Sequence, residues 1–284
     1  MQETTQIKVI SASEIARIHH PLKEINERRL ILGKAFEQAY CYVSWKVDGI
    51  IDLSNIDSEI KKQQSIRLGY KYDANNNKIE ERLMNDEITY CDICNECWNV
   101  DTIFMSPFNK EYDWMCIECM LRRMKDMLIE KAEETTTLSE EEKEYFLRIF
   151  NLFLSGNICG KTPPTTARRY ENYIVTAKPD LWDVSWNEST YNEFKIGELD
   201  DYAREQAKIF AWVVNEPINL YGVSSDFWLQ KEIVYPSEDI GKIPESIGKA
   251  YDIREICENC NLPNCNCKPV YHNYNYDNDV DYWE

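Results

Sequence analysis

Four side chains suited to metal-assisted hydrolysis lie in the segment 178–212. Asp180 comes first, followed by Glu193 and Lys195 with one residue between them, and then by Gln206. Carboxylate oxygens are the ligands that Mg²⁺ and Mn²⁺ prefer. Such an ion lowers the pKa of a bound water and neutralises charge on a phosphate, and a lysine beside it can orient or help deprotonate that water. These residue types therefore predict metal-dependent hydrolysis of a phosphodiester.

Two predicted strands position these residues. The segments 173–184 and 191–196 alternate between apolar and polar residues, and turn-forming residues separate them, so we expect a β-hairpin. The two-residue period of a strand puts Glu193 and Lys195 on one face, and Asp180 on the partner strand can join them. The simpler alternative is a surface hairpin on which Glu193 and Lys195 form an exposed ion pair.

Helical patterns are expected on both sides of the hairpin. The segment 21–47 reads as one long amphipathic helix that contains Gly33 and Glu37, and the segment 199–214 reads as a helix with Gln206 in its middle. Both helices can therefore contribute side chains to the same site.

The order of these motifs resembles that of the PD-(D/E)XK nuclease superfamily and, within it, the RecB-like exonucleases, including the CRISPR-associated branch. In this resemblance Gly33 and Glu37 match the first motif, with Glu where His is common. Asp180 matches the second motif, and Glu193 with Lys195 matches the third. The resemblance implies a catalytic role for Glu37 and for these hairpin residues, with the three acids as metal ligands.

The fourth motif departs from the family pattern, because Gln206 matches it but Phe210 stands where Tyr is usual. The resemblance covers roughly 10–50 and 165–270 and does not account for the middle of the chain. It implies an α/β fold in which helices flank a central mixed sheet, as in restriction endonucleases. It also implies Mg²⁺ or Mn²⁺ as cofactor and DNA as partner. It leaves open whether other DNA-processing proteins, or CRISPR adaptation proteins of antiviral defence, are further partners.

A group of cysteines near the C-terminus adds to the resemblance. Its members are Cys257, Cys260, Cys265 and Cys267. In many RecB-like nucleases such cysteines and one upstream cysteine hold a [4Fe–4S] cluster, and here His20 stands where the upstream cysteine is expected. Either His20 is an unusual fourth ligand, or the four cysteines bind a metal by themselves. Thiolates bind zinc and iron–sulfur alike, so both cofactors stay open.

The middle of the chain carries a second cysteine group. Two Cys-x-x-Cys pairs, separated by a loop, are formed by Cys91, Cys94, Cys116 and Cys119. This spacing predicts a structural Zn²⁺ site with tetrahedral geometry, in which Cys97 is a spare or replaces Cys94. A disulfide is a weaker interpretation, because the start of the chain does not read as a signal peptide and we expect a reducing, cytoplasmic environment.

Length and charge are consistent with a globular enzyme. The chain has 284 residues with 32 basic and 50 acidic side chains, a net charge of −18. This balance argues against nonspecific coating of nucleic acid, which needs a cationic surface, but not against binding through local patches and metal ions. No apolar run is long enough to span a bilayer.

We expect four regions along the chain. They are the helical start of a nuclease core at 1–70, an inserted zinc-binding and helical module at 71–160, the rest of the core with the last cysteines at 161–270, and a disordered acidic tail at 271–284. The predicted function is a DNA exonuclease acting on single strands or DNA ends. The alternatives are a restriction-type endonuclease and a non-catalytic, zinc-dependent protein that binds nucleic acid or serves assembly.

Overall fold

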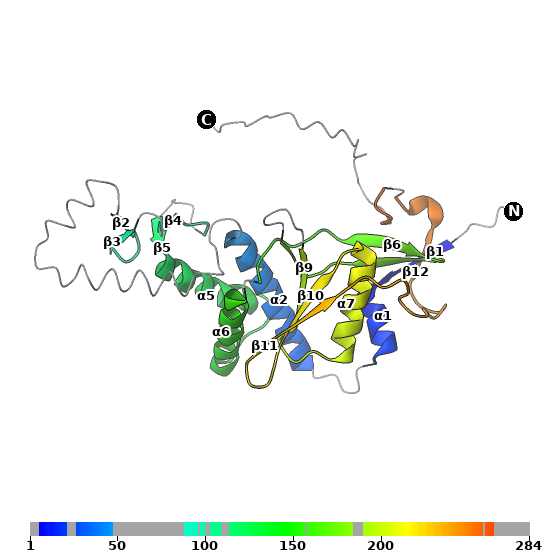
Figure 1. The fold of residues 1–284 in the computed structure, drawn as a ribbon, viewed down its shortest axis with the longest axis horizontal. Coiled ribbons are helices and arrows are strands. Elements are labelled where there is room, and N and C mark those ends of the chain that lie inside the picture. Colours follow the sequence, from blue (N-terminus) through cyan, green and yellow to red (C-terminus); the bar gives the residue numbers. More distant parts are fainter. Residues whose placement is uncertain are drawn as a thin grey trace, which may run out of the picture.

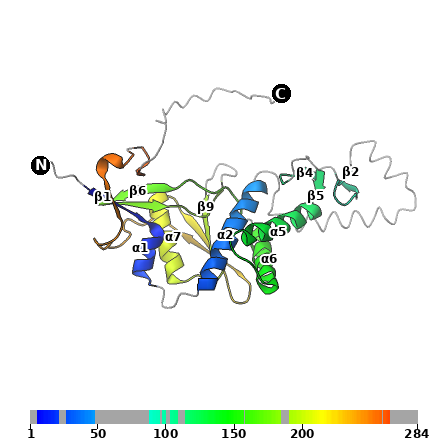
Figure 2. The ribbon, with the colours of Figure 1, turned by 180° about the vertical axis from the view of Figure 1, so that it is seen from behind.

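The computed structural model (Figures 1 and 2) shows a mixed α/β protein, which confirms the predicted class. It describes residues 6–21, 27–47, 88–95, 97–99, 103–108, 114–156, 158–183, 190–257 and 259–263. The predicted tail at 271–284 lies outside these residues. The main strands form two four-stranded sheets rather than the single central sheet that was expected.

The first sheet has the strand order β12–β1–β7–β6. Its strands are β1 (Gln6–Ser11), β6 (Thr166–Tyr170), β7 (Tyr173–Ala177) and β12 (Lys249–Asp252). Strand β1 is parallel to β7 and antiparallel to β12, and β6 is antiparallel to β7. A short 3₁₀ helix, Ile253–Glu255, follows β12. The sheet is therefore mixed, and it joins the two ends of the described chain.

The second sheet has the order β11–β10–β9–β8 and carries the predicted hairpin. Its strands are β8 (Leu181–Asp183), β9 (Thr190–Phe194), β10 (Ile218–Val223) and β11 (Leu229–Val234). Strands β8 and β9 are antiparallel, so the hairpin is confirmed with a shorter first strand. Strands β9 and β10 are parallel and are joined by helix α7 (Asp201–Val214), as a parallel pair requires.

The chain passes from the first sheet to the second between Ala177 and Leu181, where the expected long strand 173–184 is interrupted. Pro179 lies at this break, and proline cannot donate a hydrogen bond to a strand ladder. The interruption frees the backbone of Asp180 from the ladder. The position of Asp180 therefore depends on the break between the sheets as well as on the hairpin.

Four further helices flank the sheets. They are α1 (Ala12–His19), α2 (Glu27–Val47), α5 (Ile117–Glu133) and α6 (Glu140–Ser155). Side chains cap two of them: Ser11 with Glu14 forms a capping box at α1, and Ser139 with Glu142 forms one at α6, each with the Ser-x-x-Glu spacing typical of this motif. No helix of the described chain is both long and apolar enough to cross a membrane.

Four short strands form two small hairpins around the middle cysteines. They are β2 (Ile88–Tyr90), β3 (Cys97–Asn99), β4 (Ile103–Met105) and β5 (Trp114–Cys116). Strand β2 pairs with β3, and β4 pairs with β5. These hairpins lie at the opposite end of the molecule from β1 (Figures 1 and 2).

The second sheet is buried on both faces. Leu220 belongs to a hydrophobic cluster with α1 and α7, whereas its neighbour Tyr221 belongs to a cluster with α2, α5 and α6. Phe194 belongs to the same cluster as Tyr221, and its ring centre lies 5.4 Å from that of Tyr40 of α2. This alternation follows from the two-residue period of a strand. It leaves α2 packed directly against the strand that carries Glu193.

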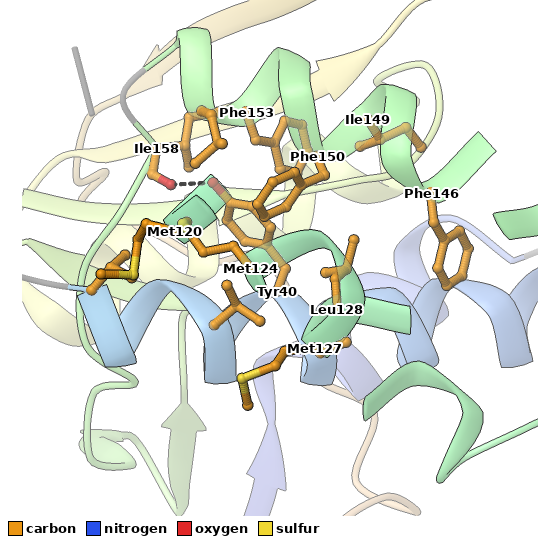
Figure 3. Packing of buried hydrophobic residues seen from close by; sticks show 14 of the residues in the cluster. Tyr40, Met120, Met124, Met127, Leu128, Phe146, Ile149, Phe150, Phe153 and Ile158 are labelled. Atoms are coloured by element: carbon orange, nitrogen blue, oxygen red, sulfur yellow. Dashed lines mark hydrogen bonds between the residues drawn. The ribbon is translucent and has the colours of Figure 1, made fainter. Parts of the chain in front are cut away.

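Polar contacts inside this core fix the position of α2, and Figure 3 shows the one between Tyr40 and Ile158. The buried hydroxyl of Tyr40 donates to the carbonyl oxygen of Ile158 at 2.5 Å. One turn later, the hydroxyl of Ser44 accepts from the backbone N–H of Gly160 at 3.1 Å. Buried polar groups need such partners, so these two bonds also set which face of α2 meets the segment before β6.

Arg28 ties the start of α2 to the start of α6. Its guanidinium donates to both carboxylate oxygens of Glu142, at 2.8 and 2.5 Å. It also donates to the Thr136 hydroxyl and to the Thr137 carbonyl oxygen, at 2.8 and 2.7 Å. Paired Arg–carboxylate bonds are directional, so this contact orients the two helices.

We expect Arg28→Ala to lower the free energy of unfolding at neutral pH and to have little effect near pH 2. The hydrogen bond from Arg28 lowers the pKa of Glu142 from 4.5 to about 2. The stabilisation is therefore present above pH 4.5 and is lost as the pH falls through about 2. Urea unfolding of both proteins across this range measures the difference. A difference that stays constant down to pH 2 would contradict the assignment.

Candidate functional site

Asp180 and Glu193 form a buried acidic pair between the two sheets. Their residues are only 8% and 2% exposed. The backbone N–H of Asp180 donates to Glu193 Oε2 at 3.2 Å, and Asp180 Oδ2 accepts from the backbone N–H of Phe194 at 2.9 Å. Each carboxylate is thus held by the backbone of the opposite segment. The hairpin that the sequence predicts does bring the two acids together.

Lys195 completes the group from the end of β9. Its ammonium lies 2.5 Å from Glu193 Oε1. Burial lowers the pKa of Lys195, but the charges of Glu193 and Asp180 outweigh burial and raise it above its ordinary value. Burial and the charges of Glu193 and Glu37 raise the pKa of Asp180 well above its ordinary value. The lysine therefore stays charged near an Asp180 carboxyl that resists ionisation.

Glu37 approaches the same pair from α2. Desolvation of its carboxyl and then the charge of Glu193 raise its pKa, whereas Lys195 and a side-chain hydrogen bond with Asp180 lower it. One turn further along α2, the Cys41 thiol donates to the Asp180 carbonyl oxygen at 3.5 Å. These contacts join the helix that carries Glu37 to the hairpin.

The group holds an excess of acidic side chains, since Glu37, Asp180 and Glu193 share the nearby ammonium groups of Lys195 and Lys178. A bound divalent cation would offset that excess, and its preferred ligands are carboxylate oxygens. The three ligand atoms do not gather as tightly as the cysteines described below. Among the described residues, only that cysteine group has all its ligand atoms within 4.8 Å of one another.

Gln206, the remaining residue predicted for this site, faces helix α1. Its residue is 6% exposed, and its amide Nε2 donates to the Ser13 hydroxyl at 2.8 Å. Its Oε1 is buried and has no hydrogen-bond partner. Phe210, one turn later, is buried in the core between α1 and α7. The structure thus gives Gln206 a contact between helices that the sequence did not suggest.

Two hollows meet at Glu37. The first hollow has a volume of about 580 Å³ and runs toward the C-terminal end of α2, with Cys41, Trp45, Lys161, Lys178 and Asp180 on its walls. The second hollow has a volume of about 620 Å³ and runs toward the N-terminal end of α2, with Arg17, Arg29, Gly33, Lys34 and Lys195 on its walls. Glu37 is therefore accessible from both hollows, Asp180 from the first and Lys195 from the second.

Several cations that line these hollows were not predicted from the sequence. Lys178 stands two residues before Asp180, so its place beside the acid could have been suspected from spacing alone. Lys161 forms a β-bridge with Trp182, a residue of strand β8 in the hairpin. Nothing in the local sequence around Lys161 indicates that pairing, because the partner residues are distant in the chain.

The comparisons with known proteins add no relative. No family model, no curated protein and no solved structure matches this chain.

The middle cysteines form the group that their spacing predicts. The sulfur atoms of Cys91, Cys94, Cys116 and Cys119 all lie within 4.8 Å of one another. Cys94 and Cys116 are 3.9 Å apart, and the backbone N–H of Cys116 donates to the sulfur of Cys91 at 3.3 Å. Four sulfur ligands in two close pairs can hold a metal such as zinc.

The same cysteines are coupled to helix α5. Cys116 is its N-cap residue and Cys119 lies in its first turn. Burial raises the pKa of the Cys91 thiol, but backbone N–H groups of Cys116 and Cys94 outweigh burial and lower it to about 7. A thiol that ionises near neutral pH is suited to metal binding. A metal held here would fix the start of the helix that packs on α2.

The C-terminal cysteines are described only in part. The backbone of Cys257 bonds with Leu262 and Asn261 in a turn that also holds Cys260. His20 is the C-cap of α1, and the described residues do not bring it within ligand distance of both Cys257 and Cys260. Cys265 and Cys267 lie outside the described residues. The iron–sulfur or zinc centre therefore stays a prediction.

We expect Cys116→Ser to release one zinc ion per chain and to lower the thermal midpoint by roughly 5–10 °C, because a structural metal contributes folding energy. Metal analysis and calorimetry of the purified, reduced protein measure both effects. Cys41→Ser is the matched control, because its thiol is also partly buried but belongs to the first hollow. Equal zinc content in the two variants would contradict the assignment.

Proposed function

We propose that this protein is a Mg²⁺- or Mn²⁺-dependent DNA nuclease of the PD-(D/E)XK type, most similar to the RecB-like exonucleases. The observation that carries the proposal is the buried pair Asp180–Glu193, with Lys195 at 2.5 Å from Glu193 and Glu37 facing the pair from α2. Burying two acids costs free energy unless a cation neutralises them. Such a pair is therefore expected at a functional or metal-binding site. Asp180 is a buried acid with a raised pKa in the wall of a hollow, which is typical of functional sites.

Three acidic residues are the metal ligands in this proposal: Glu37, Asp180 and Glu193. A bound Mg²⁺ or Mn²⁺ supplies Lewis-acid charge for the phosphate and lowers the pKa of water. Glu193 and Asp180 are held in place by backbone N–H groups, so they present their remaining lone pairs without reorganising. Glu37 approaches from the open side, between the two hollows.

Lys195 has the role of orienting the attacking water and of offsetting charge on the phosphate. Its position beside Glu193 supports both roles, since the raised pKa keeps the side chain an ammonium near neutral pH. Lys178 lines the first hollow next to Asp180 and is suited to hold a neighbouring phosphate. The fold contributes by packing α2 across the hairpin, which brings acids from two distant segments to one place.

We further propose that single strands or DNA ends are the substrate, and that a restriction-endonuclease-like core carries the site. Parallel β9 and β10 with α7 between them supply the α/β arrangement that this core needs. A centre at the last cysteines, with zinc or [4Fe–4S] and with or without His20, belongs to the same proposal. The zinc module serves as a structural staple for α5 and, through it, for α2.

We expect Asp180→Asn to reduce metal-dependent cleavage of DNA more than about 100-fold, with an unchanged or raised thermal midpoint. The amide keeps an acceptor for the Phe194 N–H but removes a charge that burial disfavours. Release of nucleotides from labelled linear DNA with Mg²⁺ or Mn²⁺ measures activity. Asp183→Asn is the control on the same hairpin. Full activity of the Asp180 variant would refute the assignment.

The same assay separates the alternatives. An exonuclease is expected to degrade linear DNA and to spare closed circles, whereas a restriction-type endonuclease cuts both. A non-catalytic zinc protein cleaves neither substrate with any divalent metal, and its binding of nucleic acid is lost when zinc is removed. Cleavage of closed circular DNA at the rate of linear DNA would exclude the requirement for an end.

A further inference from the structure

One face of α2 forms a wall that the two hollows share. Its residues recur at every fourth position and are Arg29, Gly33, Glu37, Cys41 and Trp45. The first three line the second hollow and the last three line the first, with Glu37 common to both. The two hollows, together called the groove, therefore lie along one face of the helix with Glu37 between them.

Cations line the groove on both sides of Glu37. Arg17 and Lys34 lie at the second hollow, and Lys161 and Lys178 lie at the first. The chain as a whole carries a net charge of −18, so cations on both sides of one acidic site depart from its average surface. This pattern favours a ligand with phosphates on either side of the reacting one.

The acids of the second hollow other than Glu37 are engaged within the protein. Asp200 Oδ1 caps α7 by accepting the backbone N–H of Ala203 at 2.8 Å. Glu198 Oε1 accepts the backbone N–H of Ser225 at 3.2 Å. Their charge is thus partly offset by backbone donors, which weakens their repulsion of an anionic ligand.

The C-terminal end of the groove offers an aromatic platform. Trp45 is 51% exposed, although large apolar side chains are usually buried. The Lys46 ammonium lies 5.4 Å from its ring centre. Helical rise puts Trp45 about 12 Å along the axis from Glu37. An exposed ring beside a cation is suited to stack a nucleic-acid base and hold its phosphate.

Gly33 keeps the other end of the groove open. A Cβ added at this position would meet no atom within 4 Å, so packing does not require glycine here. Glycine inside a helix is destabilising relative to most other residues. Its place in the wall of the second hollow, one turn before Glu37, is explained if a ligand passes close to the helix backbone.

We propose that this groove binds one strand of DNA along α2, with a base stacked on Trp45 and the sugar–phosphate backbone passing Gly33 at the other end. The inference rests on the proposed function for the identity of the polymer. It adds the course of the strand and its single-stranded state. Stacking on a tryptophan needs an unpaired base, and a paired base in a duplex does not offer its face to a side chain.

Binding of a fluorescein-labelled oligothymidylate of about 15 nucleotides to the full-length Asp180→Asn protein, without added divalent metal, tests the proposal. Fluorescence anisotropy then reports binding without cleavage. Adding Trp45→Ala is expected to weaken binding about tenfold, and Trp45→Phe is expected to restore most of it. The matched control is Trp228→Ala, because that residue is 75% exposed and lines neither hollow.

A second variant separates binding from folding. Gly33→Gln in the same background is expected to keep or raise the thermal midpoint, because glutamine favours helix, while it weakens binding about tenfold by filling the groove. A 15-base-pair duplex is expected to bind about tenfold less tightly than the single strand.

Unchanged binding in both the Trp45→Ala and Gly33→Gln proteins, or equal binding of duplex and single strand, would overturn the proposal. The outcome is independent of catalysis. If the wild-type protein binds as expected but cleaves no DNA with Mg²⁺ or Mn²⁺, the groove assignment stands and the nuclease assignment fails. If cleavage occurs and the Trp45 and Gly33 variants bind normally, the reverse holds.

Discussion

The arrangement of this protein depends on how helix α2 is held across the β8–β9 hairpin. Hydrophobic packing alone permits a helix to slide or rotate, whereas buried hydrogen bonds have one correct partner. Tyr40 bonds to Ile158 and Ser44 to Gly160, which fixes the rotation of the helix. That rotation presents the adjacent stripe, with Glu37 and Cys41, to Asp180. Glu37 therefore joins Asp180 and Glu193 only while these core contacts hold α2.

Features that depend on the two-residue period of a strand, or on residues close together in the sequence, could be predicted. The alternation at Glu193 and Lys195 predicted which side chains share a face, because a strand has a fixed period of two. The spacing of the middle cysteines predicted their cluster, because two close pairs need only one loop to meet. The capping boxes at Ser11 and Ser139 also depend on residues only a turn away.

Features that depend on distant pairing could not be predicted. Strand β1 pairs with β12 from the far end of the chain, and neither strand has a local pattern that names its partner. The division into two sheets follows from the break at Pro179, which a reading of 173–184 as one strand overlooked. Gln206 was predicted to lie at the acidic site because it matches a family motif. Its amide contacts Ser13 instead, because the packing of α7 on α1 determines its surroundings. Tertiary contacts here override local periodicity.

Adjacent residues at the end of strand β9 face two different environments. Phe194 packs in the aromatic core beneath α2, and its neighbours Glu193 and Lys195 form the polar group on the other side. Loss or gain of one residue between Tyr191 and Phe194 would exchange these faces, turning the charged side chains toward the aromatic core and the ring toward the acidic group. Over evolutionary time this strand can therefore accept changes of side chain but not changes of length. Length variation should collect instead in the connections between strands.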